Sequence, residues 1–326
     1  HTGNLESGFL HRFCHHIKAR SLAALQGMEL KMDDDELWSR LSVGKKCRDL
    51  NEYLEKFDFP LSLMQKEEAI TQSLRCLCSE LKEQGLMYAE IRFAPQLHTR
   101  EGLSIKRVVQ SAVNGIKDSP LMCNLIICCM RGKDTSRANL ESVRIAREFL
   151  EKGVCAVDLA GAESIYENEL FKNEISLAAR LGVPITLHAG EASGANSVRT
   201  AVDMGALRIG HGVRSCESPE LLSQLSQKGI FLELCPTSNL NTGIFKTIEE
   251  YPIRTFIENG VSFGINTDNM SVSATNIKTE WSKIIDVFEL AGDEIYAILS
   301  DTVGASFASC EQKLKMREEL QRYFNC

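Results

Sequence analysis

The sequence predicts an α/β fold whose parallel strands close into a barrel, and three observations support this prediction. Short apolar segments recur along the chain, amphipathic helical patterns separate them, and each segment follows the previous one after about 30 residues. Strands and helices that alternate at this period form a parallel sheet. Because the segments are apolar almost throughout, both faces of the sheet should be buried, which favours a closed barrel over an open sheet.

Seven apolar segments are expected to be strands. In chain order they cover residues 88–95, 122–130, 154–161, 184–191, 208–212, 230–239 and 261–269. A (β/α)8 barrel of the TIM type needs one strand more, and only the N-terminal segment remains to supply it. The strands thus predict an eight-stranded barrel with its first strand unidentified.

Amphipathic helices are expected between these strands. Apolar side chains recur at helical spacing within residues 66–84, and Gly85 follows as a stop. Ser218 precedes a proline as an N-cap, and Gly229 ends the helix that starts there. A further helix is expected at 311–323, near the C-terminus.

Composition and charge limit the classes of function. The 326 residues include 37 Lys and Arg against 44 Asp and Glu, so the net charge of −7 argues against nucleic-acid binding. No segment reaches the roughly 18 apolar residues of a membrane helix, and residues 1–16 lack the apolar core of a secretory signal. The twelve cysteines fall mostly in apolar runs, which favours reduced thiols and a cytoplasmic protein. We therefore expect a single domain, 1–326, that binds a small molecule.

Polar side chains stand near the carboxyl ends of the predicted strand segments. His188 and Glu191 are near the end of 184–191, His211 near the end of 208–212, and Asp268 near the end of 261–269. The carboxyl ends of barrel strands meet at one mouth, so these four groups should converge there. A single strand-end histidine is usually structural, but this set favours metal-assisted hydrolysis. Imidazole and carboxylate suit Zn²⁺, which lowers the pKa of water to about 7, while a glutamate outside the metal shell can transfer a proton.

The same segments resemble the adenosine deaminase family of the amidohydrolase superfamily. The resemblance extends over roughly residues 36–310 with order and spacing preserved. It rests on His188-Ala189-Gly190-Glu191, Gly210-His211-Gly212, Cys235-Pro236-Thr237-Ser238-Asn239, Asn266-Thr267-Asp268-Asn269, and the segments 88–95, 158–161 and 50–57. It implies that the region around 50–57 forms a helical lid over the mouth of the barrel.

Carried over residue by residue, the resemblance also implies chemical roles. His188 and Asp268 would be ligands of one zinc ion per chain, and Asp268 would also take a proton from the attacking water. Glu191 would be the general acid at a purine ring nitrogen. His211 would orient the hydroxide and stabilise its charge. Gly161 would contact the purine through its backbone.

Asn269 stands where many members of the family have an aspartate that contacts the purine. An amide offers both a donor and an acceptor, so we expect Asn269 to bind substrate. The implied reaction is the hydrolytic deamination of adenosine and 2′-deoxyadenosine, with release of ammonia, in purine salvage. Two alternatives stay open: an adenine or other aminopurine deaminase, and a catalytically silent homologue that binds nucleosides.

The chain departs from the family at its start. The family's first strand carries a His-x-His pair that binds zinc, and residues 1–16 contain no such pair. Three interpretations stay open. The segment is shortened or altered, His1 is the second member of a pair, or His11, His15 and His16 form a substitute site. We assign no zinc ligand there, and without that strand we expect the edges of its two neighbours to be exposed.

Overall fold

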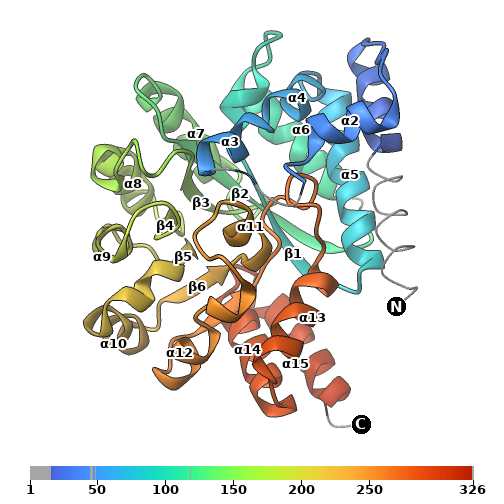
Figure 1. Ribbon diagram of the computed structural model, residues 1–326. Helices are drawn as coiled ribbons and strands as arrows, with labels where there is room; N and C mark the ends of the chain where they lie inside the picture. Colours follow the sequence, from blue (N-terminus) through green and yellow to red (C-terminus); the bar gives the residue numbers. More distant parts are fainter. Residues whose placement is uncertain (1–15, 45–46, 48, 118, 325–326) are drawn as a thin grey trace.

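The computed structural model describes residues 16–44, 47, 49–117 and 119–324 (Figure 1). Within these residues seven strands pair in parallel, in the orders β1-β2-β3 and β4-β5-β6-β7. An isolated parallel bridge between Val157 and Ile185 joins the two sheets. The strands are β1 (Tyr88–Phe93), β2 (Met122–Met130), β3 (Val154–Ala160), β4 (Thr186–Ala189), β5 (Arg208–His211), β6 (Phe231–Leu234) and β7 (Phe263–Ile265).

Each expected strand segment contains one of these strands, and the expected class, α/β with parallel strands, is confirmed. Several strands are shorter than their apolar segments. For example, β6 ends at Leu234, because Pro236 starts a helix that turns the chain away from the sheet. The described residues contain no eighth strand, and the segment 1–15 that was expected to supply it lies outside them.

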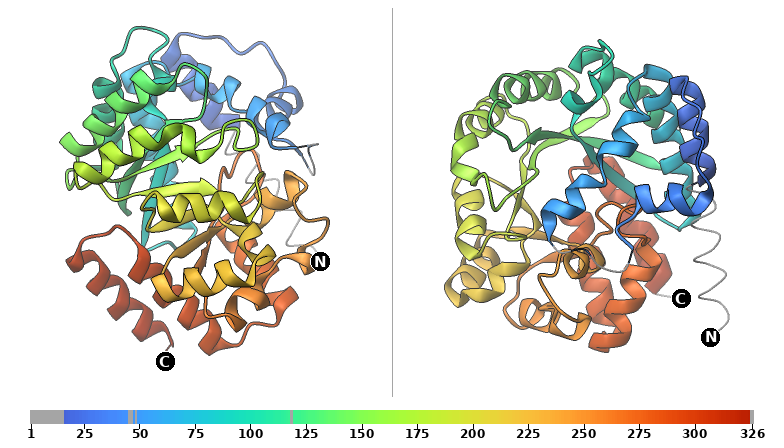
Figure 2. Two further views of the ribbon diagram at one scale, coloured as in Figure 1. Left: turned by 90° about the vertical axis from the view of Figure 1, so that its left-hand side faces the viewer. Right: turned by 45° about the horizontal axis from the view of Figure 1, so that its top comes forward.

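Helices surround the strands, as the two views in Figure 2 show. Residues 16–26 are helical. The α-helices that follow are α2 (Asp34–Leu41), α3 (Leu50–Glu55), α4 (Asp58–Ser62), α5 (Glu67–Glu83), α6 (Ile105–Lys117), α7 (Ser136–Glu148), α8 (Lys172–Arg180), α9 (Ala195–Asp203), α10 (Pro219–Lys228), α11 (Pro236–Asn241), α12 (Ile253–Glu258), α13 (Ile277–Phe288), α14 (Gly292–Ala305) and α15 (Cys310–Phe324). Short 3-10 helices are η1 (Pro95–His98), η2 (Asn168–Phe171), η3 (Val213–Glu217) and η4 (Ile248–Glu250).

The helices expected from sequence are confirmed with small changes in their ends. α5 and α15 coincide closely with 66–84 and 311–323. In α10 the Ser218 hydroxyl accepts the N–H of Leu221 at 3.3 Å, and Gly229 ends the helix in the left-handed conformation, with φ 63°. Local capping thus accounts for both ends of α10.

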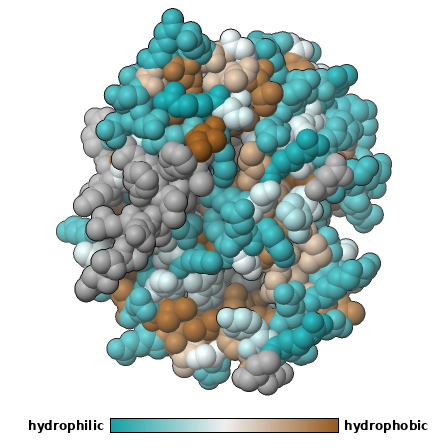
Figure 3. Space-filling view, turned by 90° about the vertical axis from the view of Figure 1, so that its right-hand side faces the viewer, coloured by the Kyte–Doolittle hydropathy of each residue, from teal (hydrophilic) through white to brown (hydrophobic). Residues whose placement is uncertain are grey.

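The apolar core lies between the strands and the surrounding helices. Val108 and Val109 of α6 and Leu125 and Ile127 of β2 are completely buried in the same cluster. The face drawn in Figure 3 is mainly hydrophilic, with hydrophobic side chains in small separate groups. No helix in the described part of the chain is both long and apolar enough to span a membrane.

Helix α3 lies over the carboxyl ends of the strands (Figure 1). Asp49 caps α3 by accepting the N–H of Glu52 at 3.0 Å. Tyr53 of α3 is buried beside Val272, which follows β7, and its hydroxyl lies 2.8 Å from that of Ser273. Side-chain packing therefore holds this helix over the mouth formed by the strand ends.

Candidate active site

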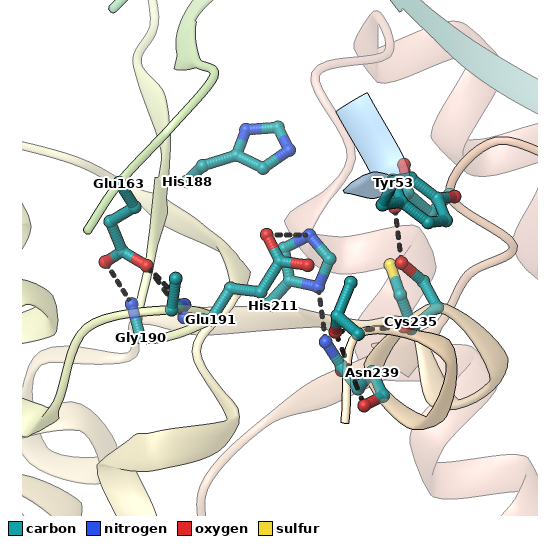
Figure 4. Close-up of polar contacts among 12 residues, drawn as sticks. Tyr53, Glu163, His188, Gly190, Glu191, His211, Cys235 and Asn239 are labelled. Atoms are coloured by element: carbon teal, nitrogen blue, oxygen red, sulfur yellow. Dashed lines mark hydrogen bonds and ion pairs between the residues drawn. The ribbon is translucent and has the colours of Figure 1, made fainter. Parts of the chain in front are cut away.

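Three of the side chains singled out from the sequence come together where β4 and β5 end (Figure 4). The imidazole rings of His188 and His211 are 5.3 Å apart between centroids. Glu191 lies on the turn after β4, and its Oε2 is 3.5 Å from His211 Nε2. The residues are adjacent because neighbouring parallel strands end at the same edge, with Ala189 in register with His211.

Asp268 lies at the same mouth, three residues after β7, and its side chain is exposed. Its Oδ2 accepts a hydrogen bond of 2.7 Å from the hydroxyl of Ser238. The negative charge of Asp268 contributes to raising the pKa of both His188 and Glu191. The expected convergence on one mouth thus includes Asp268.

His211 and Asp268 both adopt the left-handed backbone region, with φ values of 61° and 53°. Non-glycine residues enter this region infrequently, although His and Asp do so more readily than most. Such a conformation costs about 1–3 kcal/mol and persists only where the surrounding structure enforces it. Both residues therefore sit at turns that the fold maintains against a local preference.

Asp158 orients His188. This completely buried carboxylate places Oδ2 2.8 Å from His188 Nδ1, and its Oδ1 accepts the backbone N–H of His188 at 3.1 Å. Burial lowers the pKa of His188, but Asp158 outweighs burial and raises that pKa above its usual value. Since Nδ1 faces Asp158, Nε2 is the ring nitrogen left to bind a metal ion.

A chain of hydrogen bonds determines the tautomer of His211. Tyr251 Oη donates to Asn239 Oδ1 at 2.9 Å, so the amide Nδ2 faces His211 Nδ1 at 3.0 Å. An amide nitrogen is a donor only, so Nδ1 accepts and the proton of a neutral ring is on Nε2. That N–H is the one directed toward Glu191.

Glu191 is buried, with 6% of its surface exposed. Burial raises the pKa of its carboxyl, and this effect outweighs the opposing influence of His211. Among the described residues Oε1 has no hydrogen-bond partner. A buried acceptor without a partner is costly in a finished structure, so this oxygen is suited to meet a ligand.

Gly161 and Asn269, the two expected substrate contacts, differ in how the fold engages them. Gly161 directly follows β3 with φ 109°, a conformation that side-chain-bearing residues rarely adopt. Asn269 Oδ1 accepts the N–H of Val272 at 3.0 Å, so the oxygen of this amide is engaged within the local turn 269–272. Its amide nitrogen remains a donor for a ligand.

The imidazole of His188 and the carboxylate of Asp268 are groups that bind zinc. The Glu191 Oε1, which has no hydrogen-bond partner among the described residues, is consistent with a ligand bound in this mouth. Among the described residues no three His, Cys, Asp or Glu are grouped closely enough to hold a metal ion. His16 is buried and pairs with Asp34 of α2 at 3.7 Å, while its ring meets that of Trp38. His1, His11 and His15 lie outside the described residues.

Sequence reasoning missed several residues that organise this site. Glu163 lies two residues after Gly161 and is 2% exposed, and Tyr251 is equally buried. Asp158 and Asn239 belonged to recognised motifs but received no role. For Asp158, Glu163 and Asn239 the available signal was a polar residue at or after a strand end, which is too common to identify a function. Tyr251, between η4 and α12, gave no such signal.

Comparison with known proteins adds independent findings. The family model described as adenosine deaminase matches residues 20–323. The adenosine deaminase of Haemophilus ducreyi is 43% identical over 298 residues, covering 89% of this chain and 87% of the relative. That of Enterococcus faecalis is 37% identical over 309 residues, covering 94% and 91%.

Solved structures show the same fold. An adenine deaminase from Arthrobacter aurescens superposes with a TM-score of 0.85 at 23% identity, covering 95% of this chain and 94% of that one. An amidohydrolase from Burkholderia ambifaria, solved with bound zinc, also gives a TM-score of 0.85, at 19% identity, covering 95% and 86%.

Proposed function

The chain belongs to the adenosine deaminase family, and we propose that the mouth formed by its strand ends is the site where adenosine is hydrolysed to inosine and ammonia. The observation that carries this assignment is the pairing of buried Glu191 with His211 on neighbouring strand ends, next to His188. A proton donor, a polarising imidazole and a metal-binding imidazole thus share one mouth.

His188 and Asp268 are the described residues that would hold the zinc ion, with any further ligands coming from outside the described part of the chain. Zinc, when bound, supplies Lewis-acid activation of water near neutral pH. We propose that the seven described strands belong to a (β/α)8 barrel. No zinc ligand beyond His188 and Asp268 is assigned.

Glu191 is proposed to donate a proton to the ring nitrogen next to the carbon that bears the amino group. Its raised pKa supports this role, because a carboxyl that stays protonated closer to neutral pH can act as an acid. Protonation of the ring nitrogen makes the neighbouring carbon more electrophilic, and water would add to that carbon while Asp268 accepts a proton from it. Asp268 would then pass this proton to the amino group, which leaves as ammonia. The added oxygen becomes the carbonyl oxygen of inosine as its remaining proton returns to Glu191.

His211 is proposed to stabilise the negative charge that develops on the attacking oxygen. Asn239 and Tyr251 keep the proton on Nε2, the nitrogen that faces the mouth. The purine would be held by the backbone of Gly161 and the amide of Asn269. Tyr53, held over the mouth by Ser273, would limit access of bulk water.

Adenosine turnover, followed by ultraviolet absorbance, tests this assignment in the purified full chain with added zinc and after chelation. We expect turnover of adenosine rather than adenine, and loss of turnover on chelation. Glu191→Gln should keep the fold and the zinc content but lower kcat about 10²–10⁴-fold, because only the proton donor is removed. Folded, zinc-loaded protein without adenosine turnover would instead indicate a silent homologue.

A further inference from the structure

The turn that carries Glu191 is bound by a single buried carboxylate. Glu163 accepts four consecutive backbone N–H groups, from Gly190 at 2.7 Å, Glu191 at 3.1 Å, Ala192 at 2.7 Å and Ser193 at 3.0 Å. The Ser197 hydroxyl, in the first turn of α9, also donates to it at 2.5 Å. Figure 4 shows the carboxylate of Glu163 facing Gly190 and Glu191.

These hydrogen bonds favour the charged form of Glu163. Burial alone raises its pKa, but the donors from Ser197, Ser193 and Gly190 outweigh burial, so the pKa lies below the usual value. The four amides precede α9, where the chain offers them no helical acceptor. An anion held by successive amides at a helix start is a stable arrangement.

Arg131 holds the other side of the same turn. Its guanidinium donates to the backbone carbonyl of His188 at 2.7 Å and to Asn168 Oδ1 at 2.7 Å. One buried cation thus binds the strand end before the turn, and one buried anion binds the amides within it. The backbone between His188 and Ser193 is therefore held from both sides.

The side chain of Glu191, in contrast, is poorly held. Its Oε1 has no hydrogen-bond partner among the described residues, and its Oε2 reaches His211 only at 3.5 Å. Its direction is consequently set by its backbone, and that backbone is set by Glu163. A misplacement of about 1 Å can lower a rate by 10².

We propose, on the basis of the proposed function, that Glu163 is a positioning residue that aims the carboxyl of Glu191 at the substrate ring nitrogen. Glu163 itself reaches the reaction only through the backbone of 190–193. Glu163→Gln keeps the shape but turns an N–H₂ group toward the N–H donors. The turn should then shift while the rest of the site remains.

A double-mutant cycle tests this role with kcat and KM for adenosine in the zinc-loaded full chain. Glu163→Gln should lower kcat about 10–100-fold and change KM less than about 2-fold. In the Glu191→Gln background the same substitution should change kcat less than about 2-fold, because no proton transfer remains to be misplaced. Equal losses in both backgrounds would show a merely structural role and overturn the proposal.

Glu280→Gln is the matched control. Glu280 is also a completely buried carboxylate, and it accepts the N–H of Thr237 at 2.9 Å at the start of α11 rather than an N–H of the Glu191 turn. The Glu280→Gln substitution should change kcat by the same factor whether position 191 is Glu or Gln. Coupling as large as that of Glu163 would mean that any buried carboxylate affects Glu191.

Ser197→Ala is the milder variant if Glu163→Gln does not fold. It removes one of five donors to Glu163 and should lower kcat severalfold, again only when Glu191 is present. Amide hydrogen exchange gives a second readout: residues 190–193 should exchange faster in both variants, but not in Glu191→Gln. Unchanged exchange would contradict the proposal. Normal turnover by the Glu191→Gln variant would refute the acid role of Glu191 itself. Equal losses from Glu163→Gln in both backgrounds would refute the Glu163 role alone.

Discussion

At the scale of single residues, buried polar partners determine which atom each site residue presents. The carboxylate of Asp158 contacts Nδ1 of His188, and the amide of Asn239 is hydrogen-bonded to Nδ1 of His211. Both rings therefore direct Nε2 to the mouth, one as a free acceptor for a metal ion and the other as an N–H donor. Two chemically identical side chains thus receive different tasks from their neighbours.

Removal of the carboxylate at position 158 should weaken zinc binding without removing a proposed ligand. Asp158→Asn should lower zinc affinity about 10–100-fold, since partners that orient a ligand contribute by this factor. His188→Ala should lower it further. Competition with a chelator measures both. Glu148→Gln, which removes an exposed ion pair with Lys106, is the control that should keep the wild-type affinity. Unchanged affinity in Asp158→Asn would separate Asp158 from the metal site.

At the scale of the element, the turn between β4 and α9 requires glycine at position 190. Its φ is 69°, and a Cβ there would lie 2.4 Å from Cγ2 of Val198 in α9. The close approach of helix and turn brings Ser197 to Glu163. The absence of a side chain at Gly190 is therefore a condition for the network that holds Glu191.

Gly190→Ala should destabilise the protein by about 2–5 kcal/mol through backbone strain and overpacking. Val198→Ala, which shortens the obstructing side chain, should relieve the overpacking but not the strain. The double variant should therefore lose less free energy of unfolding than the two single variants added together. Urea unfolding measures all three; strict additivity would mean that the contact with Val198 is unimportant.

At the scale of the whole molecule, ion pairs cross the interior between strands that are distant in sequence. Glu233 of β6 is paired with Arg92 of β1 and, at 2.7 Å, with Arg208 of β5. Arg208 also pairs with Glu90 of β1 at 2.6 Å. These side-chain pairs connect β1 to β5 and β6 across the interior, although β1 is not a neighbouring strand of either in the described sheets.

This network predicts how stability depends on pH. Burial raises the pKa of Glu233, but Arg92 and Arg208 outweigh burial and lower that pKa to about 2. The ordinary value for a glutamate is about 4.5, so the charged carboxylate stabilises the fold above that pH. This stabilisation should be lost as the pH falls from about 4.5 to 2.

Glu233→Gln should therefore flatten the acid decline in Tm, since one titrating group is removed. At neutral pH it should cost about 3–5 kcal/mol, because two arginines lose a buried partner. Calorimetry between pH 2 and 7 measures both effects. If the Tm of Glu233→Gln falls as steeply with acid as that of the wild type, the loss of stability comes from other groups, such as Asp158, whose pKa is also lowered.

The positions of the strands and helices and the grouping of His188, Glu191, His211 and Asp268 followed from the sequence alone. Local patterns determine these features: apolar runs, capping residues, and polar groups at strand ends that a parallel sheet brings to one edge. Family motifs added expected roles to that grouping.

Only the tertiary structure decided how those groups are oriented. Glu163 and the turn it binds are separated by 27 residues or more, and Arg92 and Glu233 by 141. No periodicity encodes such pairs, because a buried acid or base looks the same in sequence whichever partner the fold gives it. The sequence therefore specified the groups present at the mouth, whereas packing specified their tautomers, charges and directions.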